Sequence, residues 1–171
     1  MDYTEVTVES PIDKKIRWAC DCFNRYKNTF LSDKKTEQLL KKFHEASGEC
    51  LNEMIRIGLV DECRRCEKEE GGSCCGAGIE NRYSGTLLLI NLLLGGKLPE
   101  KAYDSGSCFF LGPEGCSLFA RHVICVNYIC NKITDKISLQ LISSLREKEG
   151  AALEILFILN ERIKYILRNV K

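Results

Sequence analysis

The chain lacks the sequence features of a membrane-spanning, nucleic-acid-binding or secreted protein. Its longest apolar run, Leu87 to Leu94, includes Asn91 and is far too short to cross a bilayer. The net charge of the 171 residues is +1, with acidic and basic side chains interspersed, so no basic surface for nucleic acid is expected. The beginning of the chain has neither the basic start nor the apolar stretch of a signal peptide. We therefore expect a cytoplasmic protein with neither nucleic acid nor membrane as a partner.

Several catalytic sequence patterns are also absent. The segment Gly76-Ala77-Gly78 lacks the preceding strand and the further glycine of a dinucleotide-binding loop. There is no Cys-x-x-x-Cys-x-x-Cys group of a radical S-adenosylmethionine enzyme, and no Ser/His/Asp set. Leu111 stands where a CCG-type cluster domain requires a cysteine. The sequence alone therefore leaves open whether the chain is an enzyme.

Cysteine, in contrast, is abundant and unevenly distributed. The chain has 11 cysteines, an odd total that argues against a complete set of disulfides. In a reducing cytosol, clustered cysteines more often bind metal or act in redox chemistry than form structural disulfides. Eight of them fall within residues 63–130. We predict that these eight are metal ligands: Cys63, Cys66, Cys74, Cys75, Cys108, Cys116, Cys125 and Cys130.

The spacing of the first four cysteines limits how they can share a metal. Cys63 and Cys66 are separated by two residues, so one turn can direct both sulfurs at one ion. Cys74 and Cys75 are adjacent, and adjacent side chains diverge on a regular backbone. The two thiols of this pair therefore serve different sites, or one is a bystander, or the metal centre is larger than a single ion.

The order of the eight cysteines resembles a known family. After Cys63-Arg64-Arg65-Cys66 and the Cys74-Cys75 pair comes a second run, which ends the cluster. From residue 108 to 130 it reads Cys-Phe-Phe-Leu-Gly-Pro-Glu-Gly-Cys-Ser-Leu-Phe-Ala-Arg-His-Val-Ile-Cys-Val-Asn-Tyr-Ile-Cys. This is similar to the CxxCxxCC cysteine-cluster proteins, which are zinc- or iron-chelating domains and include flagellin lysine N-methylases.

The chain departs from that family pattern at three points. Seven residues, rather than two, separate Cys66 from Cys74; His122 replaces a proline, and Val126 stands where arginine is usual. The resemblance covers residues 63–130 only. It implies a metal centre and, as an alternative, a metal-dependent enzyme that modifies protein side chains.

Both zinc and an iron–sulfur cluster accept thiolates. Structural zinc sites usually combine two closely spaced cysteine pairs, and this chain has one such pair. The irregular spacing of the other cysteines favours a cluster gathered from several loops, although eight thiols also suit two four-thiolate zinc sites. We expect iron–sulfur natively, with zinc in protein made in air. Apolar neighbours would shield a cluster: Phe109, Phe110, Leu111, Val123, Ile124 and Ile129.

Other candidate residues are expected to play lesser roles. Cys20, Cys22 and Cys50 lie on predicted helices and are expected to be core or free thiols. His122 is expected to form a hydrogen bond at the edge of the site, and His44 to face solvent. Five cations flank the thiols and either offset their charge or form a solvated face: Arg64, Arg65, Lys68, Arg121 and Lys132.

The remaining pattern predicts a mainly α fold in one domain, residues 1–171. Apolar stripes at helical spacing predict flanking helices in 10–58 and 134–171, around a loop-rich cysteine segment in 63–130. Helix starts are expected at Ser10, at Ser32-Asp33 and at Thr134-Asp135. Loops are expected over 58–85 and 97–115, and a short buried helix, with a strand as the alternative, at 86–94. A short buried helix is expected from Ser117 to Cys130, and Gly150 is expected to kink the C-terminal stretch or to split it into two helices.

Three functions are compatible with these features. The first is a metal-binding protein, whose partners are a metal ion or cluster and a protein partner or protein substrate. The second is a metal-dependent protein-modifying enzyme, as the resemblance implies. The third is a thiol–disulfide redox protein that uses Cys63 and Cys66, which would require this pair at a helix N-terminus after a strand.

Overall fold

The computed structural model describes residues 6–69 and 74–170, and the predicted mainly α fold is confirmed. The helices are α1 (Ile12–Ser32), α2 (Lys34–Arg56), α3 (Leu59–Glu69), the 3-10 helix η1 (Ile79–Arg82), α4 (Gly85–Leu93), α5 (Val123–Asn127), α6 (Asn131–Thr134) and α7 (Leu139–Asn169). Two short antiparallel strands, β1 (Leu111–Gly112) and β2 (Gly115–Cys116), form a hairpin. Within the described residues, no helix has the length and apolar character that a bilayer span requires.

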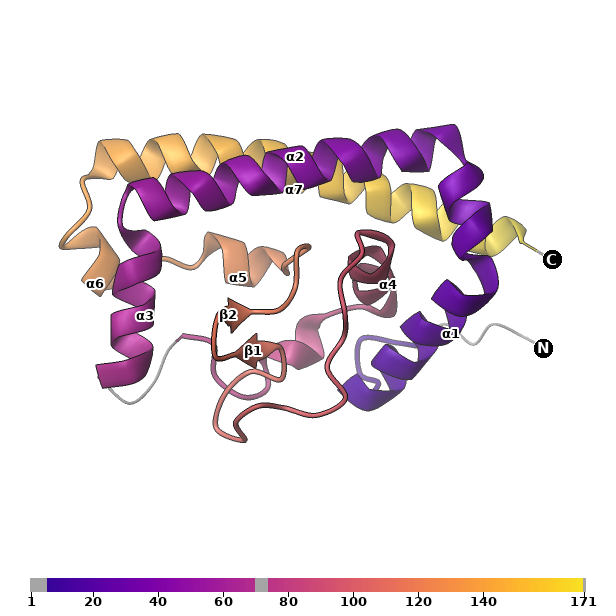
Figure 1. The fold of residues 1–171 in the computed structure, drawn as a ribbon, viewed down its shortest axis with the longest axis horizontal. Helices are drawn as coiled ribbons and strands as arrows, with labels where there is room; N and C mark the ends of the chain where they lie inside the picture. Colours follow the sequence, from indigo (N-terminus) through magenta and orange to yellow (C-terminus); the bar gives the residue numbers. More distant parts are fainter. Residues whose placement is uncertain (1–5, 70–73, 171) are drawn as a thin grey trace.

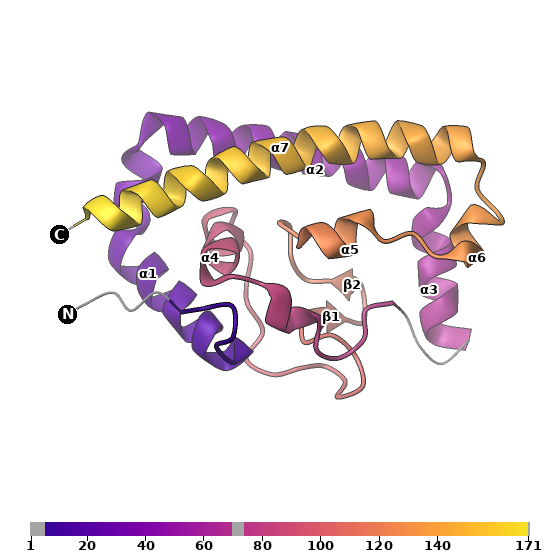
Figure 2. The same cartoon turned by 180° about the vertical axis from the view of Figure 1, so that it is seen from behind.

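The longest helices, α2 and α7, lie side by side along one edge of the molecule (Figures 1 and 2). They run antiparallel, because the start of α2 is joined to the later part of α7 through Asp33 and Arg162, and its end to the earlier part through Glu53 and Lys148. Helices α1 and α4 lie beneath one end of the pair, and α3 and α6 beneath the other (Figure 1). We call α1, α2, α4 and α7 the helical frame.

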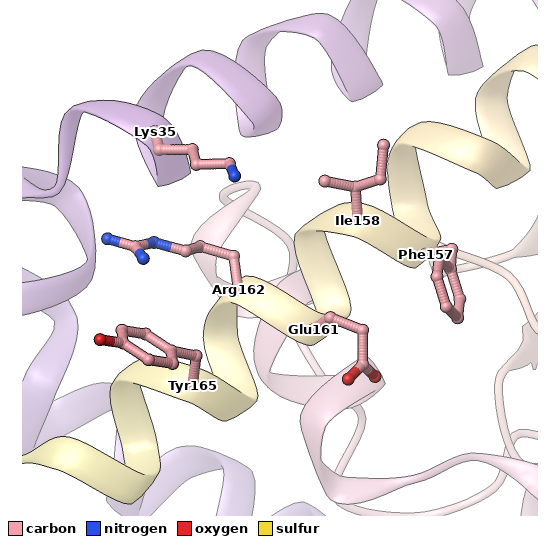
Figure 3. Close-up of a pocket in the computed structure, with 6 residues that line it drawn as sticks. All are labelled: Lys35, Phe157, Ile158, Glu161, Arg162 and Tyr165. Atoms are coloured by element: carbon pink, nitrogen blue, oxygen red, sulfur yellow. The ribbon is translucent and has the colours of Figure 1, made fainter.

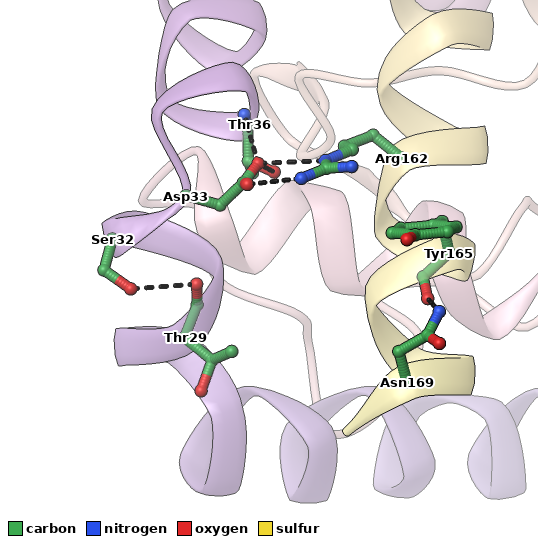
Figure 4. A network of polar contacts seen from close by, with 7 residues as sticks. All are labelled: Thr29, Ser32, Asp33, Thr36, Arg162, Tyr165 and Asn169. Carbon is green, nitrogen blue, oxygen red and sulfur yellow. Dashed lines mark hydrogen bonds and ion pairs between the residues drawn. The ribbon is translucent and has the colours of Figure 1, made fainter.

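The start of α2 is fixed by one carboxylate. Asp33 is the N-cap and accepts a hydrogen bond from the backbone N–H of Thr36 at 2.8 Å. The same carboxylate accepts two hydrogen bonds from Arg162 of α7, at 3.0 and 2.5 Å (Figure 4). Together these bonds hold the pKa of Asp33 well below its usual range, chiefly through Arg162. Asp33 therefore couples the beginning of one helix to the side of the other.

The predicted caps at Ser10 and Thr134 are wrong. The N-cap of α1 is Pro11 with no side-chain cap, because the Ser10 hydroxyl accepts from the backbone N–H of Thr7 instead. Thr134 is the last residue of α6, and Ser138 caps α7. In both cases the hydroxyl forms a hydrogen bond with a different backbone group, as Ser and Thr side chains readily do. Ser10 accepts from the N–H of Thr7, and Thr134 donates to the carbonyl of Asn131.

Helix α4 is the centre of the core. Leu88, Leu89 and Ile90 have no exposed surface, and the helix packs against α1 and α7. The ambiguous 86–94 segment is therefore a helix, as favoured, rather than a strand. At its first residue, Gly85, a Cβ would lie 2.6 Å from the Trp18 ring of α1. The two helices approach this closely only because Gly85 has no side chain.

Three further expectations from the sequence differ from the structure. Residues 59–69 form α3 rather than a loop, since the glycines of 58–85 lie outside this charged, helix-compatible stretch. Helix α7 continues through Gly150 without a break, because its apolar face stays packed against α2 on both sides of that residue. The buried helix expected over 117–130 is limited to α5, which is five residues long and has no buried residue, because it lies at the surface.

Candidate metal centre

The eight predicted ligands lie in the part of the molecule that the helical frame leaves open. Cys63 and Cys66 are on α3, Cys116 is on β2 and Cys125 is on α5, all located in Figure 1 by their elements. We call this part, made of α3, residues 74–83 and residues 98–134, the thiol region. Within the described residues, no two cysteines are joined as a disulfide.

Four of the thiols surround α3, and we call Cys63, Cys66, Cys74 and Cys130 the α3 group. Cys63 and Cys66 are one turn apart on the same face of α3. Helix α6, which packs against α3, has Cys130 as its N-cap residue. Burial raises the pKa of Cys63 to about 11, with further contributions from neighbouring thiols. Those neighbours are Cys74, Cys130 and Cys66.

The other four thiols meet around the β1–β2 hairpin, and we call Cys75, Cys108, Cys116 and Cys125 the hairpin group. The backbone N–H of Cys108 donates to the carbonyl of Cys75 at 2.7 Å, beside a bridge between Gly76 and Ser107. The hairpin then places Cys116 opposite Leu111, three residues after Cys108. A hydrogen bond with Cys74 lowers the pKa of Cys75 and outweighs two opposing effects, burial and the neighbouring thiols of Cys116, Cys125 and Cys108.

Backbone amides are directed at two sulfurs of the hairpin group. Burial raises the pKa of Cys108 to about 11, and the N–H of Phe110 opposes this shift. Burial also raises the pKa of Cys116, opposed by the N–H of Leu118. Cys116 as a residue is exposed, yet burial of its sulfur is the largest effect. In both cases the amide two residues ahead stabilises negative charge on sulfur, as in many cluster sites.

Only some of the predicted cations face the thiols. Lys132 Nζ lies 3.5 Å from the sulfur of Cys66. Arg121 lowers the pKa of both Cys63 and Cys116, so its charge favours thiolate in both groups. Arg64 and Arg65 instead form ion pairs along α3, with Asp61 and with Glu62 and Glu69.

The expectations for the histidines are confirmed. His122 is the N-cap of α5, and its Nδ1 accepts from the backbone N–H of Ile124 at 3.2 Å. Burial, followed by the charge of Arg82, lowers the pKa of His122. His44 is exposed on α2, where its ring meets Phe119 edge-on. Neither Cys22 nor Cys50 belongs to the two thiol groups, since both are buried in the main core.

Apolar shielding is narrower than the sequence predicts. Phe110 is buried and contacts Tyr83 edge-on, while Val123 and Ile124 are about half exposed. Helix α5 is short and lies at the surface, so its apolar side chains do not turn inward. The expectation that Val123 and Ile124 shield the centre is therefore wrong.

Two residues that position the site were missed by the sequence reasoning. Tyr83 is buried, and its hydroxyl lies 3.8 Å from the Cys125 sulfur while accepting from the backbone N–H of His122. Asn91 is buried in α4 and makes three hydrogen bonds of 2.9–3.0 Å, two of them to the backbone of Ala120. A signal for Asn91 was present, because one amide interrupts an otherwise apolar run; Tyr83 gave none.

The chemistry of the donor set fits a soft metal. Within the parts of the chain that the structure describes, no three His, Cys, Asp or Glu side chains converge on one point tightly enough to bind an ion. The two groups nevertheless consist of thiols throughout, which are the ligands that zinc and iron–sulfur clusters share. The donor type therefore suits either metal.

An open pocket lies elsewhere, on the outer side of the frame near the start of α2 (Figure 3). It is lined by Lys35, Phe157, Ile158, Glu161, Arg162 and Tyr165. None of the eight predicted ligands lines it.

Comparisons with known proteins give no relative for this fold or site: no family model, no curated protein and no solved structure matches the chain.

Proposed function

We propose that this chain is a metal-binding protein that holds zinc or an iron–sulfur cluster through eight cysteine thiolates. The observation that supports this most is the gathering of thiols from α3, residues 74–75, the β1–β2 hairpin and the α5–α6 segment into mutual electrostatic contact. Thiols packed together in this way raise one another's pKa. A bound cation reverses that unfavourable charge and deprotonates coordinating thiols outright.

The choice between the two metals follows the donor geometry. Ligands from four separate segments suit an iron–sulfur cluster, and amides directed at Cys108 and Cys116 are typical of cluster surroundings. We favour iron–sulfur natively and zinc in protein prepared in air, because zinc binds such thiolate sites well. Reduced thiolates are maintained in the cytoplasm, which is the compartment we propose.

The two alternatives draw less support from this arrangement. A thiol–disulfide redox protein needs a cysteine of low pKa at a helix N-terminus. Cys63 lies one turn inside α3, and its pKa is raised to about 11. A protein-modifying enzyme of the kind that the CxxCxxCC resemblance suggests stays the alternative, with a protein substrate as its partner.

The test is elemental analysis and a visible spectrum of protein purified without oxygen. We expect iron or zinc bound in the wild type and in Cys20→Ser, and a marked loss of metal in Cys66→Ser, because a neutral hydroxyl does not replace a thiolate ligand. Cys20 is the control because it belongs to α1 and to neither thiol group. The proposal fails if the wild type binds neither metal while all 11 thiols react freely.

A further inference from the structure

The two thiol groups differ in what holds them, which bears on how many metal centres they form. Three members of the α3 group, Cys63, Cys66 and Cys130, lie on or at the start of α3 and α6, which pack around a small separate core. That core contains Leu59, Ile133, Ile137 and Leu145, with Cys130 packed against it. The position of this group therefore depends on how α3 and α6 pack.

The hairpin group is carried by loops that pack on the main core. Cys108 is one of the buried residues of that core, and Cys75 and Cys125 pack against it. Tyr83, also in the main core, reaches the Cys125 sulfur and the backbone of His122. Asn91 of α4 fixes Ala120, between Cys116 and Cys125. This group therefore takes its position from the helical frame rather than from α3.

The adjacent cysteines belong to different groups. Cys74 is among the thiols close to Cys63, whereas Cys75 is close to Cys108, Cys116 and Cys125. Their sulfurs also share a hydrogen bond, so the two groups meet at this one dipeptide. What separates the two cysteines is the set of neighbours around each. The backbone bond between Cys108 and Cys75 holds Cys75 in the hairpin group, while Cys74 is among the thiols near Cys63 on α3.

We propose that the eight thiols form two separate four-thiolate metal sites, one in the α3 group and one in the hairpin group, with Cys74 and Cys75 on either side of the division. The inference rests on the metal-binding function proposed above and adds its stoichiometry and ligand sets. Four thiolates complete the coordination of one tetrahedral zinc ion or of one [4Fe–4S] cluster. Each chain therefore binds two zinc ions or two clusters.

The division predicts opposite results for neighbouring substitutions. Cys74→Ser should remove the metal of the α3 group and Cys75→Ser that of the hairpin group, so each variant keeps about half the metal of the wild type. Brief alkylation followed by peptide mass spectrometry then identifies the thiols that have been released. In Cys74→Ser, we expect labelling of Cys63, Cys66 and Cys130. In Cys75→Ser, we expect labelling of Cys108, Cys116 and Cys125.

A second pair of variants keeps the test independent of how the dipeptide folds. Cys130→Ser should match Cys74→Ser, and Cys125→Ser should match Cys75→Ser, in both metal content and labelling pattern. Helix content from circular dichroism confirms that each variant is folded. If both members of a pair lose all metal, or if the released thiols span both groups, the chain holds one undivided centre and the two-site inference is overturned. Metal-free wild-type protein would instead overturn metal binding itself.

Discussion

The helical frame and the thiol region are stabilised in different ways. The frame buries apolar side chains from four helices and fastens α2 to α7 with charged pairs such as Glu53 with Lys148. The thiol region has one short helix against another, a hairpin of two-residue strands and a long loop. Buried apolar surface therefore stabilises the frame, whereas the thiol region would depend on the metal that we propose.

Metal removal is the change that should separate the two regions most. If the proposed metal is bound, chelation under reducing conditions should abolish most hydrogen-exchange protection in residues 59–69 and 98–130, because nothing then ties the sulfurs of separate segments together. Protection should persist in 34–56 and 139–169, where apolar packing is unaffected. Amide exchange read by mass spectrometry checks this. Uniform loss of protection across the chain would show that the frame is not independent.

Removing the amide of Asn91 should weaken the joint between the two regions. Asn91→Ala leaves both backbone groups of Ala120 without their partners, and buried unpaired groups are costly. We expect the free energy of unfolding in urea to fall by about 2–4 kcal/mol. Asn169→Ala is the control, because that amide is exposed and donates to the carbonyl of Tyr165 one turn earlier in the same helix (Figure 4). Equal effects of the two variants would contradict the role given to Asn91.

A change inside the frame should lower stability without releasing metal. In Gly85→Ala, the new Cβ would meet the Trp18 ring at 2.6 Å, so α1 and α4 must separate. Overpacking of this kind costs about 1–3 kcal/mol. Gly150→Ala is matched to it, since nothing lies within 4 Å of that Cβ and alanine favours the helix. Thermal unfolding and metal content of both variants test this; loss of metal in Gly85→Ala would contradict the separation of regions.

The smallest expected effect concerns the pH dependence of the frame. Asp33→Asn keeps an oxygen to cap α2 but loses the charge that pairs with Arg162, which we expect to cost about 1 kcal/mol at neutral pH. The pKa of Asp33 is lowered in the folded protein, so its contribution is complete above the unfolded pKa and declines as pH falls through the folded one. The difference in unfolding free energy between the two proteins, measured in urea from pH 7 to pH 2, should therefore be constant above about pH 4 and shrink steadily below it. A difference that stayed constant over the whole range would exclude this ion pair as the cause.

Sequence patterns predicted the frame well and the thiol region poorly, for a physical reason. The apolar residues of α2 and α7 recur at helical spacing, and in the structure these residues form the packed faces of the two helices. Asp33 was recognisable in the sequence as a helix N-cap. The kink predicted at Gly150 is absent from α7, because the packing of this helix outweighs the weak helix propensity of one glycine. The loops of the thiol region have no period, so their course is set by contacts between distant residues.

The candidate site was also predictable from the sequence in part. The density of cysteines was visible in the sequence, and so were the adjacent pair and the flanking cations. Which thiols lie together was not, because Cys63 and Cys130 become neighbours only through the packing of α6 on α3. Tyr83 was equally hidden, since its contact with Cys125 spans 42 positions of the chain. Spacing predicts the kind of ligand, while the fold decides the grouping.

The antiparallel pairing of α2 with α7 affects how the chain folds, because it joins segments that are far apart in the sequence. Contacts such as Asp33 with Arg162, 129 positions apart, give the fold a higher contact order than a bundle of consecutive helices. Long-range pairing slows folding because a large loop must close before its contacts form. The whole thiol region lies within that loop. The chain is therefore expected to fold more slowly than its helix content suggests, with its cysteines exposed to solvent, and to any competing metal, until α7 has docked.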